Sequence, residues 1–156
     1  MQHSGKGKPR NHRVSHAQSG YRYQMFTHLA RTLLGAALAY AGFTHLTSNR
    51  EEFQAQVPTI LQSQADFVVI ASGVVEIILG ISLIFLFKYR TQIGWIVAAF
   101  FTAIFPGNIS QYLNGADAFG LNTDQARATR LLFQPLLVIW ALWSTGAWKS
   151  YRSKKK

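Results

Sequence analysis

The sequence contains no cysteine, and this absence excludes several kinds of chemistry. Without thiols the chain alone forms no disulfide, holds no iron–sulfur cluster and carries no dithiol relay. Acidic residues are also scarce, because 6 Asp and Glu stand against 16 Lys and Arg and give a net charge of +10. Such a charge is found in nucleic-acid-binding proteins, but here the basic residues flank apolar segments, as juxtamembrane charges do. We therefore expect no nucleic-acid partner.

Long apolar segments dominate the rest of the chain. Each has about 19 to 22 residues, enough to cross a hydrocarbon layer of about 30 Å as a helix. The sequence therefore predicts an all-α fold, namely a membrane-spanning antiparallel four-helix bundle. The four predicted spans are 26–47, 67–87, 91–112 and 130–148.

Charges are sorted between the ends of these spans. If the spans alternate in direction, only Arg50, Arg127 and Arg130 of the 16 basic residues lie on one side, together with every acid except Glu76. Basic residues favour the cytoplasmic side of a membrane. The sequence therefore predicts a multi-pass protein of the plasma (inner) membrane with both termini in the cytoplasm.

The domain organisation follows from this topology. We expect a disordered basic cytoplasmic head at 1–25, a transmembrane domain at 26–149 and a basic cytoplasmic tail at 150–156. Between the first two spans, Phe53, Val57 and Ile60 recur at helical spacing, which predicts an interfacial segment that Pro58 interrupts. The loop before the last span contains glycines and is expected to be irregular. Thr123 is expected to cap the helix that follows this loop.

Small residues favour close helix packing in a membrane. We expect the first span to use Gly35 and Gly42 in this way, and the second span to use Gly80. In the third span, Ala99, Ala103 and Gly107 lie four residues apart on one face and predict a similar contact. Arg31 and His28 are interpreted as ordinary flanking residues.

Polar side chains inside a span are costly in lipid and are functional candidates by default. Most of those found here fall in the outer half of the predicted bundle. Pro106 and Pro135 lie in the same half, and each leaves the carbonyl of the residue four earlier, Thr102 or Leu131, without its helical donor. We therefore predict a polar ligand-binding pocket in the outer half. Its candidate residues are His45, Glu76, Asn108, Gln111, Arg130 and Gln134.

Each candidate also has a purely structural interpretation. The Arg130 side chain can extend to the membrane interface, and the His45 side chain can cap its helix. The Asn108 side chain can form hydrogen bonds with the backbone groups that Pro106 leaves unpaired. Glu76 lies near the midplane, where a carboxylate is paired or protonated, and we expect it to be coupled to Arg130, directly or through another group. No metal site is expected, because we place His45 and Glu76 about 10 Å or more apart in depth. Haem ligation is also not expected within one chain.

Several motifs in this order resemble the DoxX-like family of small four-helix membrane proteins. The resemblance extends over about residues 32–148. The matching segments are Ala41-Gly42-Phe43-Thr44-His45-Leu46, Phe53 with Val57-Pro58, Ser72-Gly73-Val74-Val75-Glu76 with Gly80, Phe105-Pro106-Gly107-Asn108 and Arg130-Leu131-Leu132-Phe133-Gln134.

The resemblance implies a redox-accessory subunit of a quinone-linked system, which would bind a quinone in the outer pocket. A non-enzymatic membrane scaffold or assembly factor is the alternative, and a small solute carrier fits least well because the chain has no obvious inverted repeat. The expected partners are the lipid bilayer and other membrane-protein subunits. No residue pattern for hydrolysis or phosphoryl transfer is present, so catalytic activity stays an open question at this point.

Overall fold

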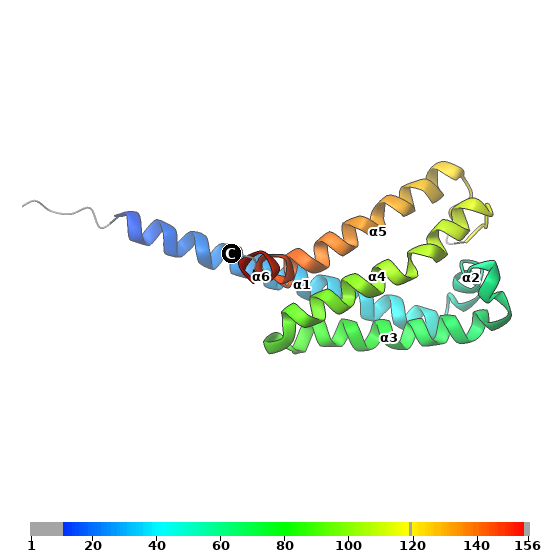
Figure 1. Cartoon of the computed structure of the whole chain (residues 1–156), viewed down its shortest axis with the longest axis horizontal. Coiled ribbons are helices and arrows are strands. Elements are labelled where there is room, and N and C mark those ends of the chain that lie inside the picture. The colour runs from blue at the N-terminus through cyan, green and yellow to red at the C-terminus, as the bar shows by residue number, and fades with distance from the viewer. Residues whose placement is uncertain (1–10, 119, 155–156) are drawn as a thin grey trace, which may run out of the picture.

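The computed structural model describes residues 11–118 and 120–154, and all regular structure in those ranges is helical. The expected all-α class is therefore confirmed. Four helices are long and two are short, and two 3₁₀ segments, η1 and η2, join them (Figure 1). The bounds are α1 Asn11–Leu46, α2 Arg50–Gln54, η1 Thr59–Gln64, α3 Ala65–Phe85, η2 Phe87–Tyr89, α4 Arg90–Leu113, α5 Asp124–Ser144 and α6 Ala147–Lys154.

Two helical segments of the described chain, Thr59–Phe85 and Phe87–Leu113, are long and apolar enough to cross a membrane. A third crossing is possible if α5 and α6, which are bent by 64° relative to each other, act as one span. The predicted first span lies in α1, which does not meet the same standard, since Arg31 and several other polar residues interrupt its apolar run. Membrane association is therefore compatible with the fold.

Helix α1 is longer than the sequence predicts. We expect a disordered head up to residue 25, but the helix already begins at Asn11. Adding a residue to an existing helix orders only that residue and gains one hydrogen bond, so a helix anchored at its C-terminal half can extend into a polar segment. Residues 1–10 lie outside the described part of the chain.

Helices α1 and α3 pack against each other at glycine contacts, as the small residues predict. A Cβ atom on Gly42 would lie 2.4 Å from the carbonyl oxygen of Gly73, and one on Gly35 would lie 2.7 Å from that of Gly80. No real Cβ atom approaches a backbone oxygen so closely, so only glycine permits this contact. The close crossing sets the register that brings the end of α1 beside the middle of α3.

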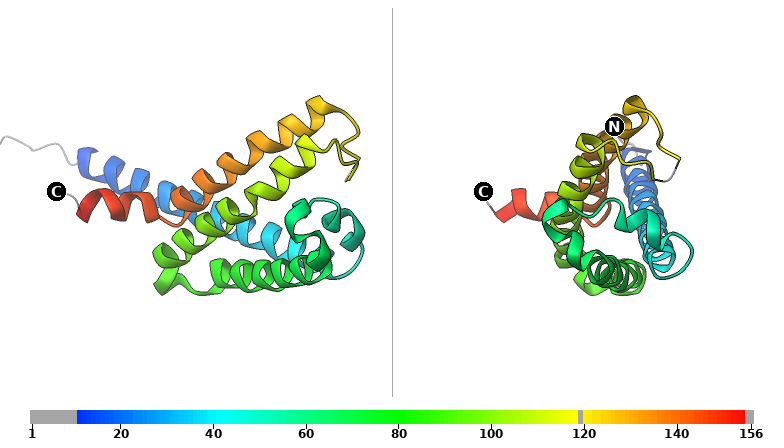
Figure 2. Two further views of the ribbon diagram at one scale, coloured as in Figure 1. Left: turned by 45° about the vertical axis from the view of Figure 1, so that its right-hand side comes forward. Right: turned by 90° about the vertical axis from the view of Figure 1, so that its right-hand side faces the viewer.

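Helices α4 and α5 form a second pair, which diverges from the α1–α3 pair toward the end of the molecule that carries α2 (Figures 1 and 2). We call this end the α2 end. Near the centre the two pairs share a core built on Leu34, Leu83, Val97 and Phe101. The face with Ala99 and Ala103 does not make the predicted helix contact, because both residues are exposed. The adjacent Ala98 is buried instead, in a cluster with Leu142.

The segment between α1 and α3 is broken at Pro58, as predicted, since Pro58 ends the turn after α2 and precedes η1. Its apolar residues do not share one face. Val57 is buried against Val69, whereas the side chain of Ile60 is 88% exposed. The Nε atom of Arg50 donates to Asp66 Oδ1 over 2.6 Å, which ties α2 to α3, and this hydrogen bond raises the pKa of Arg50.

Helix α5 begins where the sequence predicts and ends earlier. The Thr123 hydroxyl accepts a hydrogen bond from the Ala126 amide over 3.2 Å, which confirms Thr123 as the N-cap. The helix was expected to continue to residue 148 but ends at Ser144, and Gly146 follows with φ +73°. Because this left-handed conformation is easy only for glycine, the chain turns here, and residues expected in the tail enter α6.

Candidate functional site

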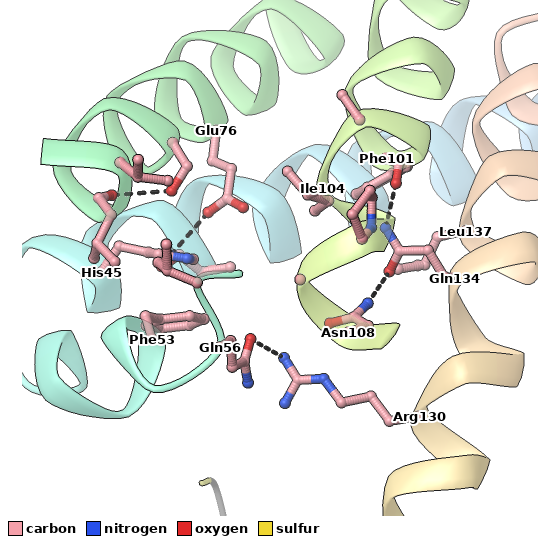
Figure 3. Close-up of a pocket in the computed structure, with 18 of the residues that line it drawn as sticks. His45, Phe53, Gln56, Glu76, Phe101, Ile104, Asn108, Arg130, Gln134 and Leu137 are labelled. Atoms are coloured by element: carbon pink, nitrogen blue, oxygen red, sulfur yellow. Dashed lines mark hydrogen bonds and ion pairs between the residues drawn. The ribbon is translucent and has the colours of Figure 1, made fainter. Parts of the chain in front are cut away.

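A cavity of about 800 Å³ lies where the two helix pairs diverge. Its walls come from the second half of α1, the first half of α3, the second half of α4 and the first half of α5, with the α2–η1 segment across one side. The lining is mainly apolar, from residues such as Leu38, Val69, Phe101 and Ile104. Figure 3 shows the polar side chains that extend from opposite walls into this space.

On the α1–α3 wall, His45 and Glu76 form a buried pair. The Nδ1 atom of His45 lies 3.0 Å from Glu76 Oε2 and 2.8 Å from the carbonyl oxygen of Ala41. A carbonyl oxygen only accepts hydrogen bonds, so Nδ1 carries the ring proton and donates it to Ala41. Glu76 Oε2 lies at ion-pair distance from the same atom and makes no hydrogen bond among the described residues. The side chains of His45 and Glu76 are 9% and 6% exposed. This arrangement couples an acid and a base beside the cavity.

Phe53 of α2 lies flat against the His45 ring. The ring centroids are 3.3 Å apart and the planes differ by 19°. The aromatic ring covers the imidazole on the side of α2 and restrains its orientation. The α2 segment therefore takes part in the site as well as connecting two helices.

On the α4–α5 wall, two amides connect the helices. The Nδ2 atom of Asn108 donates to Gln134 Oε1 over 2.9 Å, and Gln134 Nε2 donates to the Phe101 carbonyl over 2.6 Å. Pro106 was expected to leave the Thr102 carbonyl without its helical donor. The carbonyl that Gln134 contacts is the neighbouring one, at Phe101.

Arg130 extends from α5 toward the α2–η1 segment. Its Nη2 atom donates to Gln56 Oε1 over 3.1 Å, across a sequence separation of 74 residues. Gln56 is buried, and its Nε2 atom has no hydrogen-bond partner among the described residues. Gln56 was not predicted as a site residue. Gln56 lies in a polar connecting segment, where nothing in the sequence indicates that a glutamine is buried. Its only distinguishing feature in the sequence is its position beside the apolar Val57 and two residues before Pro58.

Five of the six predicted site residues therefore line one cavity, and Gln111 does not. Gln111 is 1% exposed, and its Nε2 atom lies 3.4 Å from the carbonyl oxygens of Ala116 and Ala118. It holds the loop between α4 and α5. Arg127, which the sequence did not single out, supports the same loop.

Arg127 is buried and neutralised by two acids. Its Nη1 atom donates to Asp124 over 2.8 Å, its Nη2 atom to Asp117 over 2.5 Å, and its Nε atom lies 3.4 Å from the Ala116 carbonyl. The signal for this role was the pair of acids that precedes Arg127 by three and ten residues. This group organises the rim of the cavity and does not face into it.

The separation predicted for His45 and Glu76 is wrong. We placed the two residues about 10 Å or more apart in depth by assuming that adjacent spans end at the same level. The Gly42–Gly73 contact instead sets His45 beside Gly73, one helical turn from Glu76. Glu76 is accordingly paired with His45, whereas Arg130 donates to Gln56.

The site combines an apolar enclosure with a buried acid–base pair on one wall and amide and guanidinium donors on the other. Such a site can bind a mostly apolar ligand, orient it through a few acceptor atoms and exchange a proton with it. Within the described ranges, no group of three or more His, Cys, Asp or Glu side chains is arranged to hold a metal ion.

The fold thus defines a class of helical proteins in which an apolar cavity lies between two helix pairs; in the described ranges all regular structure is helical. The model of one family, described as a domain of unknown function (DUF8561), matches residues 34–145. This match covers more than half of the chain, so the chain belongs to the DUF8561 family. No curated protein and no solved structure matches it.

Proposed function

We propose that this chain is an integral membrane protein of the DoxX-like type, in which α1, α3, α4 and the α5–α6 unit cross the plasma (inner) membrane as an antiparallel four-helix bundle. Two of these segments are apolar and long enough to cross without further assumption. The sorting of basic residues supports cytoplasmic termini. In this orientation the α2 end lies outside, and the cavity occupies the outer half of the bundle.

Accessibility tests this topology. Single changes Ser4→Cys, Asn49→Cys, Asn122→Cys and Ser153→Cys introduce the only thiol in a chain without cysteine. In intact cells, an impermeant maleimide should label the cysteines at 49 and 122 and should leave those at 4 and 153 unlabelled. Labelling of both position 49 and position 153 from outside would contradict the proposed orientation.

We propose further that the cavity binds a quinone and that the chain serves as a redox-accessory subunit. The observation that carries this proposal is the placement of polar groups on opposite walls of one apolar cavity. A quinone is an apolar ring with two carbonyl acceptors on opposite sides. Arg130 and the Gln56 amide offer donors on one side. On the other side, the Glu76 carboxyl group, whose Oε2 makes no hydrogen bond among the described residues, would donate to the second carbonyl when it carries a proton. The cavity volume lies within the range of about 300–1,000 Å³ that small-molecule sites occupy.

The chemistry of the site suits proton handling. Reduction of a quinone to a quinol takes two electrons and two protons. The electrons would come from a redox partner subunit. The His45–Glu76 pair would deliver one proton to the carbonyl oxygen beside it, and a water molecule would deliver the second proton to the opposite oxygen. This role agrees with the burial of the pair, because a shielded acid–base pair exchanges protons with a bound ligand more readily than with bulk water.

Quinone binding is tested on the purified protein. Lipid extraction and mass spectrometry should find a quinone at about one per chain, and a short-chain quinone should quench tryptophan fluorescence on titration. Gln56→Leu removes the Nε2 donor and also the acceptor that orients Arg130, so it should raise Kd about tenfold. The matched control is Gln62→Leu, which changes an exposed amide of η1. Equal affinities for the two variants would exclude the proposed contact.

A non-enzymatic scaffold or assembly factor is the second candidate. The hydrogen bonds from Asn108 to Gln134 and from Gln134 to Phe101 are complete without a ligand, as helix-aligning contacts would be. In addition, α5 exposes Leu132, Phe133 and Leu136, which suit contact with another membrane helix or with lipid. Reproducible co-purification of one membrane protein, with no quinone present, would favour this function.

A further inference from the structure

A second pocket, of about 680 Å³, lies at the end of the molecule opposite the α2 end. It is formed by α1, the first residue of α4 and the bend between α5 and α6. Three cationic side chains line it, from Arg90, Lys149 and Arg152, together with the aromatic side chains of Tyr23, Trp143 and Trp148. None of these residues belongs to the site described above.

No acidic side chain neutralises the positive charge at this pocket among the described residues that line it. All six acids of the sequence lie in the described ranges, and none lines the pocket. Asp66, Asp117 and Asp124 form ion pairs with Arg50 and Arg127 at the α2 end, and Glu76 is paired with His45. Cations brought together without an acid repel one another, so an anion from outside the chain would stabilise this arrangement.

Arg31 adds a buried cation close by. It lies one helical turn after Thr27, which lines the pocket, and its side chain is among the most completely buried in the described structure, with the residue 1% exposed. The guanidinium lies 4.4 Å from the centre of the Phe87 ring, and its Nε atom has no hydrogen-bond partner among the described residues. A buried Arg balanced by an aromatic ring and no carboxylate maintains a positive potential at this end.

Ser144 supplies an independent observation. It lines the pocket and is 5% exposed, and its hydroxyl makes no hydrogen bond within the described residues. A buried hydroxyl without a partner costs free energy, and serine in a helix commonly donates to the carbonyl one turn earlier. The adjacent Thr145 does so, with its hydroxyl 2.6 Å from the Ala141 carbonyl. Ser144 therefore retains a donor that a ligand in this pocket can use.

We propose that this pocket binds the phosphate group of an anionic phospholipid. Arg90, Lys149 and Arg152 would neutralise the phosphate, and the Ser144 hydroxyl would donate to one of its oxygens. The apolar side chains of Ile139, Leu142 and Trp143 line the same pocket and would contact the acyl chain of the lipid. Free phosphate has no apolar part that could make these contacts, so the lining favours a lipid. Trp and Tyr at the rim are typical of headgroup depth. This inference rests on the membrane placement proposed above and is independent of quinone binding.

Native mass spectrometry of the full chain tests the proposal. The protein is released from nanodiscs that contain equal amounts of phosphatidylglycerol and phosphatidylcholine. Wild-type protein should retain one phosphatidylglycerol about tenfold in excess over phosphatidylcholine. The variant Arg90→Gln with Arg152→Gln should lose this preference. The control Arg22→Gln with Lys88→Gln removes the same charge outside the pocket and should keep it. Loss of the preference in both variants would show a general charge effect and would overturn the site.

Ser144→Ala separates a ligand contact from a structural role. Because the hydroxyl has no hydrogen-bond partner in the part of the chain that the structure describes, the substitution should leave the thermal stability of the lipid-free protein unchanged. It should lower phosphatidylglycerol retention about threefold or more. A loss of stability without a change in retention would contradict the proposal. Binding of inorganic phosphate alone as tightly as the lipid would assign the pocket to a soluble anion and overturn the lipid assignment. Equal retention of both lipids by protein that passes the cysteine-labelling test would refute lipid recognition while leaving the topology intact.

Discussion

The two ends of the molecule treat buried charge in opposite ways. At the α2 end, acidic side chains of the chain neutralise Arg127, which is held by Asp117 and Asp124, and Arg50, which is held by Asp66. In the cavity at this end, His45 lies beside Glu76, and Arg130 donates to the Gln56 amide. At the opposite end, Arg31 is buried without any acid, and a pocket nearby gathers three more cations. The first end thus neutralises two of its three arginines with acidic side chains of its own. The second end has no acidic side chain in its pocket and, as proposed above, binds an anion from its surroundings.

The largest expected effect concerns the contact that assembles the α2 end. Gly42→Ala places a methyl group 2.4 Å from the Gly73 carbonyl, where only backbone movement relieves the clash. Separation of α1 from α3 would also separate His45 from Glu76, so we expect a loss of about 3 kcal/mol in the free energy of unfolding. Thermal denaturation in detergent measures the effect. Gly20→Ala, where a Cβ atom meets nothing within 4 Å, is the control and should not destabilise the protein.

The second prediction compares an arginine from each end directly. Arg127→Gln removes two ion pairs and a carbonyl contact, and should lower stability by about 2 kcal/mol. Arg31→Gln removes a buried charge that no carboxylate neutralises, and in neutral detergent we expect a change below about 1 kcal/mol. Stability curves for both variants in the same detergent provide the comparison. Equal losses would show that the two ends are not electrostatically different.

A double-mutant cycle sharpens the description of the α2 end. His45→Gln and Glu76→Gln should show a coupling energy of about 1 kcal/mol, because the two side chains are in contact at 3.0 Å. The same cycle with Arg130→Gln in place of His45→Gln should be additive within about 0.5 kcal/mol. A larger coupling between Glu76 and Arg130 would restore the pairing that the sequence suggested.

The smallest effect is local. Thr123→Ala removes the cap of α5 and should cost about 1 kcal/mol, with fraying confined to the first turn of α5. Thr123→Ser retains the hydroxyl and should be close to neutral. Hydrogen exchange should show faster amide exchange near Ala126 in Thr123→Ala and unchanged rates in α6. Faster exchange in α6 as well would mean that the two ends are coupled through α5.

The residues that the sequence located correctly are those that differ from their surroundings. His45, Glu76 and Gln134 each interrupt an apolar segment, so their burial cost marks them, and the structure places them at one cavity. Gln56 gives no such signal, because it lies in a polar segment and is buried only through the packing of α2 and η1. Thr123 was predictable as a cap because capping depends on local sequence alone.

Tertiary register explains most of the remaining differences. Depth along single helices placed His45 far from Glu76, whereas the Gly42–Gly73 crossing brings them into contact. Arg31 resembled a flanking charge because its burial depends on Phe87, which lies on a segment far along the chain. Ala99 and Ala103 do not pack against α5, because α5 contacts the neighbouring face at Ala98, and Ala103 lines the cavity instead. Periodicity alone does not decide between two such similar surfaces.

Gly146 lies between the last two helices at φ +73°, and α6 turns by 64° relative to α5. A single achiral residue therefore sets the angle at which Trp148 and Arg152 reach the pocket beside Arg90. Any L-amino acid at this position would favour a straighter path and carry these side chains away from the pocket. The configuration at the Cα atom of residue 146 thus decides whether the cationic side chains of α6 reach the pocket. Gly146→D-Ala, introduced by peptide ligation, would preserve the angle between α5 and α6 that Gly146→Ala destroys.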